Sequence, residues 1–132
     1  MRYLLDTDIC IYAIKNRPPQ VLARLRAHEA DGIGLSSISV AELFFGAVKS
    51  GSAKNLTALR RFLAPLELAD FVPRAAEVYG NLRAALEQAG TPIGPLDTQI
   101  AAHALALGAV LVSNHTREFA RVPSLALQNW MA

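Results

Sequence analysis

Short apolar runs alternate with longer amphipathic segments along almost the whole chain. Several of these runs are too short for buried helices and are bounded by turn or capping residues, which is typical of buried strands. We therefore expect strands at Arg2–Leu5, Ile33–Ser36, Leu66–Leu68, Ala109–Ser113 and Leu125–Leu127. Strands separated by helices favour an α/β fold with a parallel sheet of four or five strands and right-handed crossovers.

Prolines, glycines and capping residues mark where the intervening helices begin and end. Thr7 or Asp8 can cap the first helix, and Ser37 or Ser39 can cap the third. The helices are expected to run from Thr7 to about Lys15, Gln20 to Ala30, Ser37 to Ser50, Ala53 to Leu63, Pro73 to Ala89 and Asp97 to Leu107. Neither a repeat nor a linker interrupts this series, so residues 1–132 are predicted to form a single domain.

The composition shows a surplus of apolar residues. Hydrophobic residues make up 52% of the 132 positions, and the mean hydropathy is +0.26. A domain of this size hides only part of such a surplus in its own core, so we expect a surface that a partner covers, as in a homodimer. The longest apolar run, Ala104–Val112, is shorter than the ~20 residues of a membrane-spanning helix, and no membrane segment is expected.

The single cysteine bears on the location of the protein, and the net charge bears on the kind of substrate. Cys10 has no partner for an internal disulfide, and the first residues lack the apolar core of a signal peptide, so we expect a cytoplasmic location. The net charge of +2 and the isoelectric point near 9.0 permit a polyanionic substrate without requiring one. Candidate contacts to such a substrate, at the ends of expected helices, are Lys15, Arg17, Lys49 and Lys54.

Three carboxylates stand in apolar surroundings, where a charge is costly. Asp6 ends the first expected strand, Glu42 lies between Ala41 and Leu43, and Asp97 follows Leu96. A buried carboxylate without a partner costs several kcal/mol and tends to become protonated. Carboxylates that converge without a basic residue suit a divalent cation, and Mg²⁺ prefers oxygen ligands. This pattern predicts a metal-dependent hydrolase of phosphate esters.

Two of these acids, Glu42 and Asp97, also have a purely structural interpretation. Ser39 and Glu42 fit the capping-box pattern, in which the glutamate only supports the start of a helix. Asp97 has the position of an acid favoured by a helix dipole, and Asp8 has the position of a helix cap. His103 lies on a mostly apolar helix, where a packed and hydrogen-bonded histidine is expected rather than a catalytic one.

Four blocks of sequence, taken in order, resemble the PIN-domain ribonucleases and, within them, the VapC toxins of type II toxin–antitoxin systems. The blocks are Leu4-Leu5-Asp6-Thr7-Asp8-Ile9, Ser39-Val40-Ala41-Glu42-Leu43, Thr91-Pro92-Ile93-Gly94-Pro95-Leu96-Asp97 and Thr116-Arg117-Glu118-Phe119. The resemblance implies a three-layer α/β/α fold. It also implies an endoribonuclease that depends on Mg²⁺, with Mn²⁺ as a substitute, and that cleaves structured RNA such as transfer RNA.

The same resemblance assigns roles to the three acids, which match the acidic positions of the family one for one. It implies that Asp6 and Asp97 anchor the metal, while Glu42 completes the charge balance or orients the attacking water. Two positions depart from the family pattern. Leu96 stands where close relatives carry asparagine, and His115 stands where aspartate or asparagine is common. The fourth ligand therefore stays open between Asn114, His115 and water.

Toxins of this kind are silenced by a VapB-like antitoxin, and the sequence offers a surface for one. The segments Val40–Val48 and Leu56–Leu63 carry more large apolar side chains than one inward face needs, namely Phe44, Phe45, Leu59 and Phe62. We expect them to form a groove for an amphipathic helix. An arginine from that partner could neutralise the acidic site and exclude the metal.

Two other function classes remain as alternatives. Leu4-Leu5-Asp6-Thr7-Asp8 also matches the start of haloacid dehalogenase-like phosphatases, which form an aspartyl-phosphate. Those enzymes need paired acids near the last core strand, and no adjacent acidic pair exists in this chain. The second alternative is a non-catalytic interaction module whose acids bind arginines of a partner. Such a module would keep its biological effect after the substitution Asp6→Asn.

Overall fold

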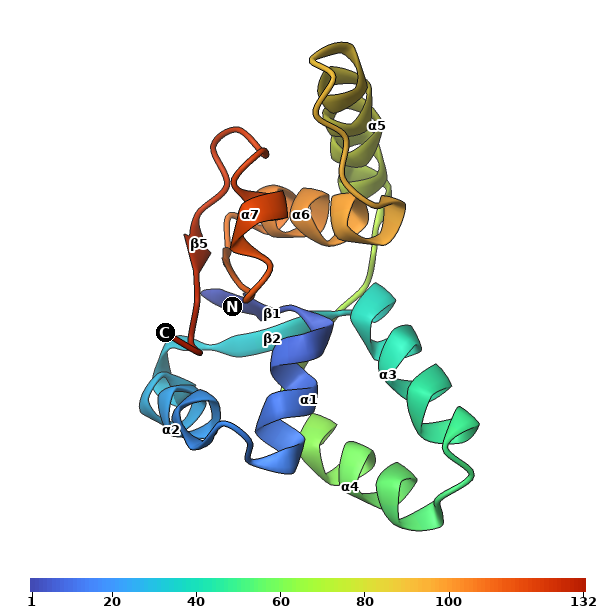
Figure 1. The fold of residues 1–132 in the computed structure, drawn as a ribbon, viewed down its shortest axis with the longest axis vertical. Helices are drawn as coiled ribbons and strands as arrows, with labels where there is room; N and C mark the ends of the chain where they lie inside the picture. The colour runs from blue at the N-terminus through green and yellow to red at the C-terminus, as the bar shows by residue number, and fades with distance from the viewer.

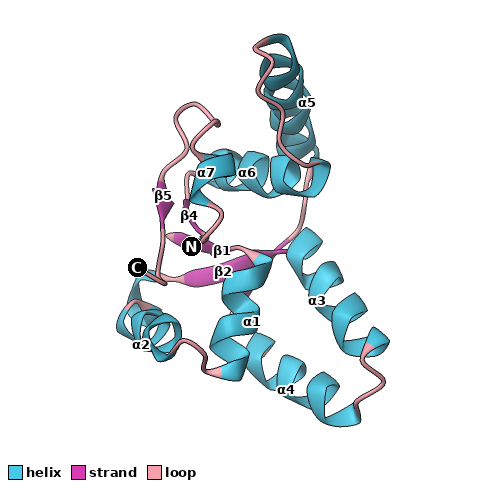
Figure 2. Cartoon of the chain, in the orientation of Figure 1, coloured by secondary structure: helices cyan, strands magenta, loops and turns pink.

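A five-stranded parallel sheet forms the centre of the molecule (Figure 2). The computed structural model describes residues 1–132. Its strands are β1 (Tyr3–Leu5), β2 (Ile33–Ser36), β3 (Glu67–Ala69), β4 (Val110–Val112) and β5 (Leu127–Gln128). They lie in the order β3-β2-β1-β4-β5, and every neighbouring pair is parallel. The predicted α/β class and parallel sheet are confirmed.

Helices cover both faces of this sheet, which gives three layers (Figure 1). On one face lie α1 (Thr7–Lys15), α2 (Pro19–Ala27), α3 (Ser37–Lys49) and α4 (Ala53–Leu63). On the other lie α5 (Pro73–Gln88), α6 (Pro95–Leu107) and α7 (Thr116–Phe119). Helix α5 packs against α6 and projects away from the sheet (Figure 1).

The alternation of side chains along β1 divides the core into two halves. Tyr3 and Leu5 point into the cluster under α1 to α4, whereas Leu4 points into the cluster under α5 to α7. Leu4 and Leu5 are fully buried, so each contributes about 1.5–3 kcal/mol of transfer free energy. A strand buried on both faces reads as a continuous apolar run, which is why the first strand was visible in the sequence.

Close packing between β2 and β3 depends on Gly34. A Cβ atom at this position would lie 2.2 Å from the backbone oxygen of Glu67 on β3, far inside van der Waals contact. Only glycine therefore allows this pairing, in which Gly34 lies opposite Glu67.

No helix of the chain has the length and apolar character needed to cross a membrane.

Some element boundaries differ from the expected ones. The helix expected over Gln20–Ala30 is α2, which ends at Ala27 and is followed by the short 3₁₀ helix η1 (Glu29–Asp31). Strand β3 begins one residue later than predicted, and strand β5 begins two residues later. Helix α7 was not predicted, because four residues are too few for a helical period to emerge.

Candidate active site

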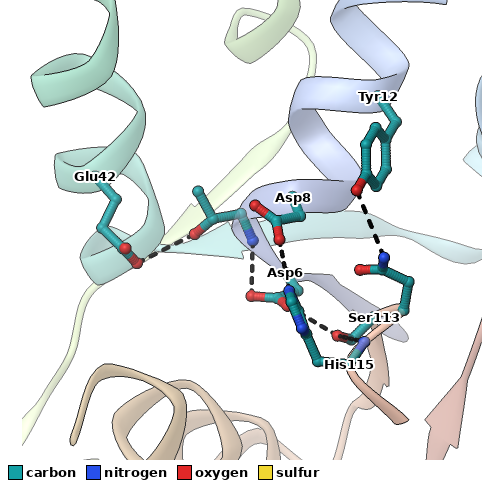
Figure 3. A network of polar contacts seen from close by, with 8 residues as sticks. Asp6, Asp8, Tyr12, Glu42, Ser113 and His115 are labelled. Carbon is teal, nitrogen blue, oxygen red and sulfur yellow. Dashed lines mark hydrogen bonds and ion pairs between the residues drawn. The ribbon is translucent and has the colours of Figure 1, made fainter. Parts of the chain in front are cut away.

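Asp6 connects the end of β1 to the start of α1. Its Oδ1 accepts a hydrogen bond of 2.8 Å from the backbone N–H of Thr7, so Asp6 itself is the helix cap, not Thr7 or Asp8 as expected. Its Oδ2 accepts a second bond of 2.8 Å from the hydroxyl of Ser113, at the end of the neighbouring β4. The side chain is buried (Figure 3).

The pKa of Asp6 is raised above its ordinary value. Burial is the largest cause, because it penalises the charged form, and the nearby Asp97 raises the pKa further. The hydrogen bonds from Ser113 and Thr7 oppose this shift. The nearby His115 also lowers the pKa of Asp6. Asp6 is thus held in place by two donors and forms no ion pair with a lysine or arginine.

Glu42 reaches the same edge of the sheet from the middle of α3. Ser36 caps this helix by accepting from the backbone N–H of Ile38 at 3.1 Å, and Ser39 lies inside its first turn. The capping-box interpretation of Glu42 is therefore wrong. Its Oε1 instead accepts a hydrogen bond of 3.1 Å from the hydroxyl of Thr7 on α1 (Figure 3). Partial burial raises the pKa of Glu42, and the charge of Asp97 adds to the shift.

Asp97 lies in the first turn of α6, the only acid there, where the helix dipole favours a negative charge. Burial nevertheless raises the pKa of Asp97, while the nearby His115 opposes that rise. Glu118 and Asp8 also raise this pKa through their charges. Asp97 therefore belongs to an acidic region to which several elements contribute.

Asp6, Glu42 and Asp97 are linked by their charges, since Asp97 raises the pKa of both other acids. None of the three forms an ion pair with a lysine or arginine. Hard oxygen donors without a lysine or arginine partner match what Mg²⁺ requires. No three histidine, cysteine or acidic side chains are grouped closely enough to hold one ion. A bound ion would thus have to draw the carboxylates together or be completed by water.

The two polar residues left open as a fourth ligand, Asn114 and His115, both contact α1. Asn114 donates from Nδ2 to the Tyr12 hydroxyl at 3.5 Å, and its Oδ1 is buried without a partner. His115 is paired with Asp8, which was expected to act as a helix cap. Ser113 was not recognised as a partner of Asp6 at all. Its one visible signal was its place at the end of an apolar strand.

Three further residues can be compared with expectation. His103 is buried, and its Nδ1 lies 2.7 Å from the hydroxyl of Ser36, as expected for a packed and hydrogen-bonded histidine. Lys15 and Lys49 were expected near the acidic edge. They are the last residues of α1 and α3, whose opposite ends meet the sheet (Figure 1). Arg17 follows the same end of α1, and Lys54 lies in the first turn of α4.

An apolar groove runs between α1, α3 and α4 and reaches the acidic edge. It has a volume of about 330 Å³, and its lining includes Ile11, Leu43 and Leu59 as well as Glu42 and Lys15. The groove expected between the third and fourth helices therefore exists. Of the four large side chains expected to form it, Leu59 lines it, Phe44 and Phe62 pack against the core, and Phe45 is exposed.

Comparison with known families accounts for this combination of fold and acids. A model of the PIN domain matches residues 3–125, which is most of the chain. The chain belongs to the PIN domain family. The PIN fold expected from the four sequence blocks is therefore confirmed, and the phosphatase alternative falls away.

Full-length relatives place the chain within one branch of the PIN family. Ribonuclease VapC2 of Haemophilus influenzae is 44% identical over 132 residues, which cover 99% of both proteins. The tRNA(fMet)-specific endonuclease VapC of Salmonella typhimurium is 39% identical over 131 residues, which cover 98% of each. Identities of this level over the whole length show that the chain is a member of the VapC ribonucleases.

Solved structures agree with this PIN assignment. VapBC2 from Rickettsia felis, bound to a DNA fragment from its promoter, contains a chain that is 42% identical, with a TM-score of 0.90. The match covers 98% of the present chain and 99% of the other. DNA-bound VapBC from Salmonella typhimurium gives a TM-score of 0.90 at 38% identity, with 98% of each chain covered.

Proposed function

We propose that this VapC protein is the toxin of a type II toxin–antitoxin pair and hydrolyses phosphodiester bonds in RNA with the help of Mg²⁺. The proposal rests on carboxylates from three different elements: Thr7 donates to both Asp6 and Glu42, and the charge of Asp97 acts on both of these acids. Asp6, Glu42 and Asp97 all have raised pKa values. Their mutual repulsion is the electrostatic condition that a bound divalent cation would relieve.

Each acid would have a distinct part in the reaction. When bound, Mg²⁺ supplies a Lewis acid that polarises the phosphoryl oxygen and lowers the pKa of water. Asp6 and Asp97 would hold the ion, and Asp6 is already fixed by its two donors. Glu42, oriented by Thr7, would accept a hydrogen bond from the attacking water and then its proton.

We further propose structured RNA, and transfer RNA in particular, as the substrate. The support is the name of the relative from Salmonella typhimurium, a tRNA(fMet)-specific endonuclease that is 39% identical over almost its full length. Sequencing the 5′ ends of RNA cleaved in cells that express the chain would identify the RNA and the cleaved bond. Cuts restricted to messenger RNA would contradict this choice of substrate.

The decisive experiment measures cleavage of bulk tRNA by the purified chain with Mg²⁺, with Mn²⁺ and with EDTA. We expect cleavage with either ion and none with EDTA. Asp6→Asn and Asp97→Asn should each lower the rate by about two orders of magnitude or more while the circular dichroism spectrum is retained. Asp31→Asn, an exposed acid in η1 remote from the acidic edge, is the matched control and should keep its activity. Full activity in Asp97→Asn would contradict the role proposed for Asp97.

The antitoxin would occupy the apolar groove between α1, α3 and α4. An amphipathic helix fits a groove lined by Ile11, Leu43 and Leu59. Glu42 belongs to the lining of this groove, so a basic side chain of the same partner could reach the acidic site and replace the cation. The neighbouring VapBC structures are complexes of related proteins and support a VapB-like partner.

We also propose that the chain is a homodimer that joins the antitoxin in a larger assembly. Large apolar side chains remain exposed on several elements, which is typical of a surface covered by a partner. They are Phe45, Val48, Leu68, Val72, Leu96 and Leu107. Light scattering coupled to gel filtration should give twice the 14.2 kDa mass of the chain. A monomer at micromolar concentration would contradict this proposal.

A further inference from the structure

A second polar pair lies beside the three carboxylates. Nε2 of His115 is 2.5 Å from Oδ2 of Asp8, although the two residues are 107 positions apart in the sequence (Figure 3). Asp8 belongs to the first turn of α1, and His115 immediately precedes α7. The pair therefore bridges two elements that border the acidic edge of the sheet.

The surrounding contacts fix the position of this pair. The backbone N–H of His115 donates to the hydroxyl of Ser113 at 2.9 Å, and that hydroxyl donates to Asp6. Asn114 contacts the hydroxyl of Tyr12, one helical turn beyond Asp8 on the same face of α1. The His115 ring is thus held both by its own backbone and by the partner on α1.

One edge of the imidazole stays available. Nε2 is taken by Asp8 in the one hydrogen bond that the His115 side chain forms, and this side chain is 41% exposed. The hydrogen bond to Asp8 is the main cause that raises the pKa of His115, and the charges of Asp6 and Asp97 raise it as well. These contacts favour the imidazolium form, in which Nδ1 carries a hydrogen that it can donate.

A polyanion that approaches this edge meets the negative charges of Asp6, Asp8 and Asp97. Lys15 and Lys49, the basic residues first considered for RNA contacts, lie at the far ends of their helices. We propose that His115 is a phosphate-binding residue, whose Nδ1–H donates a hydrogen bond to an RNA phosphate oxygen at the acidic site. Asp8 is the positioning residue that holds the ring. This inference rests on the ribonuclease function proposed above.

The test is a double-mutant cycle on RNA binding, measured with fluorescently labelled bulk tRNA and the full chain in EDTA, so that no cleavage occurs. His115→Ala should weaken binding about tenfold. The slope of log K against log salt should become shallower by about 0.7–0.9, the contribution of one phosphate contact. A purely structural role would leave this salt slope unchanged.

The Asp8 variants separate a contact from simple charge neutralisation. His115→Ala leaves Asp8 unpaired and repulsive, so the double variant Asp8→Asn/His115→Ala removes that repulsion. If His115 contacts phosphate, the double variant keeps the reduced salt slope and binds more weakly than the unchanged chain. Recovery of full affinity in the double variant would show that His115 only neutralises Asp8. Tighter binding by Asp8→Asn alone would overturn the positioning role.

The alternative role for Nδ1 of His115 is to bind the metal ion. In the Mn²⁺-loaded protein, electron spin echo spectra detect a nitrogen directly bound to the ion. We expect no such coupling, and a ¹⁴N coupling that disappears in His115→Ala would overturn the phosphate assignment. If the unchanged chain binds and cleaves tRNA but all variants bind equally, this inference alone fails. If the unchanged chain does not bind tRNA, the proposed function fails with it.

Discussion

The hydroxyl of Thr7 donates a hydrogen bond of 3.1 Å to Oε1 of Glu42 and so joins the start of α1 to the middle of α3. The backbone N–H of the same residue donates to Asp6. One threonine therefore orients two of the three candidate acids, through two different groups. Replacing its side chain should affect Glu42 while the contact to Asp6 is preserved.

We predict that Thr7→Val lowers kcat for RNA cleavage about tenfold, because Glu42 loses the donor that orients it. The hydrogen bond from Thr7 lowers the pKa of Glu42, so its loss should raise that pKa. If Glu42 acts as the base, the acidic limb of the pH–rate profile should move to higher pH. Thr7→Ser should restore both the rate and the profile. An unshifted profile in Thr7→Val would argue against Glu42 as the base.

A second prediction concerns Ser113, which is fully buried and donates to Asp6 across the sheet. Ser113→Ala should lower the free energy of unfolding by about 1–3 kcal/mol, because a buried carboxylate oxygen loses its donor. The loss should be larger at pH 8 than at pH 4, since the hydrogen bond favours the ionised form of Asp6. Ser50→Ala, at an exposed hydrogen-bonded serine, serves as the control for urea denaturation. Equal losses at both pH values would contradict this account.

The third prediction follows from the raised pKa of Asp97. An acid with a raised folded-state pKa stabilises the fold below its ordinary pKa of 3.8, and this contribution is lost as the pH rises through the raised value. In EDTA at pH 8, the melting temperature of Asp97→Asn should therefore be about 3 °C higher than that of the unchanged chain. This difference in melting temperature should shrink toward pH 4. Other titrating groups, such as His103, are present in both proteins, so their effects on stability cancel in the comparison.

Mg²⁺ should reverse this order of stability. It should raise the melting temperature of the unchanged chain at pH 8, because an ion that binds only the folded state stabilises it, and should have little effect on Asp97→Asn. Asp31→Asn should melt like the unchanged chain under both conditions. If Asp97→Asn melts no higher than the unchanged chain in EDTA, the three acids do not repel one another as proposed.

The sequence predicted those features that depend on local pattern. Strands such as Tyr3–Leu5 were visible because burial on both faces makes a continuous apolar run. The three acids were visible because each interrupts an apolar segment. The helix caps were assigned to the wrong residues. Asp6 directly follows β1 and caps α1, and Ser36 is the last residue of β2 and caps α3. A pattern that assigns one role per residue misses that double use.

The contacts between distant residues could not be predicted. Ser113 reaches Asp6, and His115 reaches Asp8, because β4 pairs with β1. Strand order and register are tertiary properties, and a single sequence carries no local signal for them. The partners of the acids were therefore found only in the structure, whereas the acids themselves were found in the sequence.

A final prediction separates the antitoxin groove from the acidic site. Gly46 lines the groove on α3, and a Cβ there would meet no atom within 4 Å, so Gly46→Leu should fold and even favour the helix. The added side chain would fill the space expected for the partner helix. We predict unchanged cleavage of RNA and loss of inhibition by the product of the adjacent reading frame, in coexpression and pull-down. Gly80→Leu, at an equally open position on α5, is the matched control and should stay inhibited. If Gly46→Leu is inhibited as well as Gly80→Leu, the antitoxin binds elsewhere, because a leucine cannot share this groove with another helix.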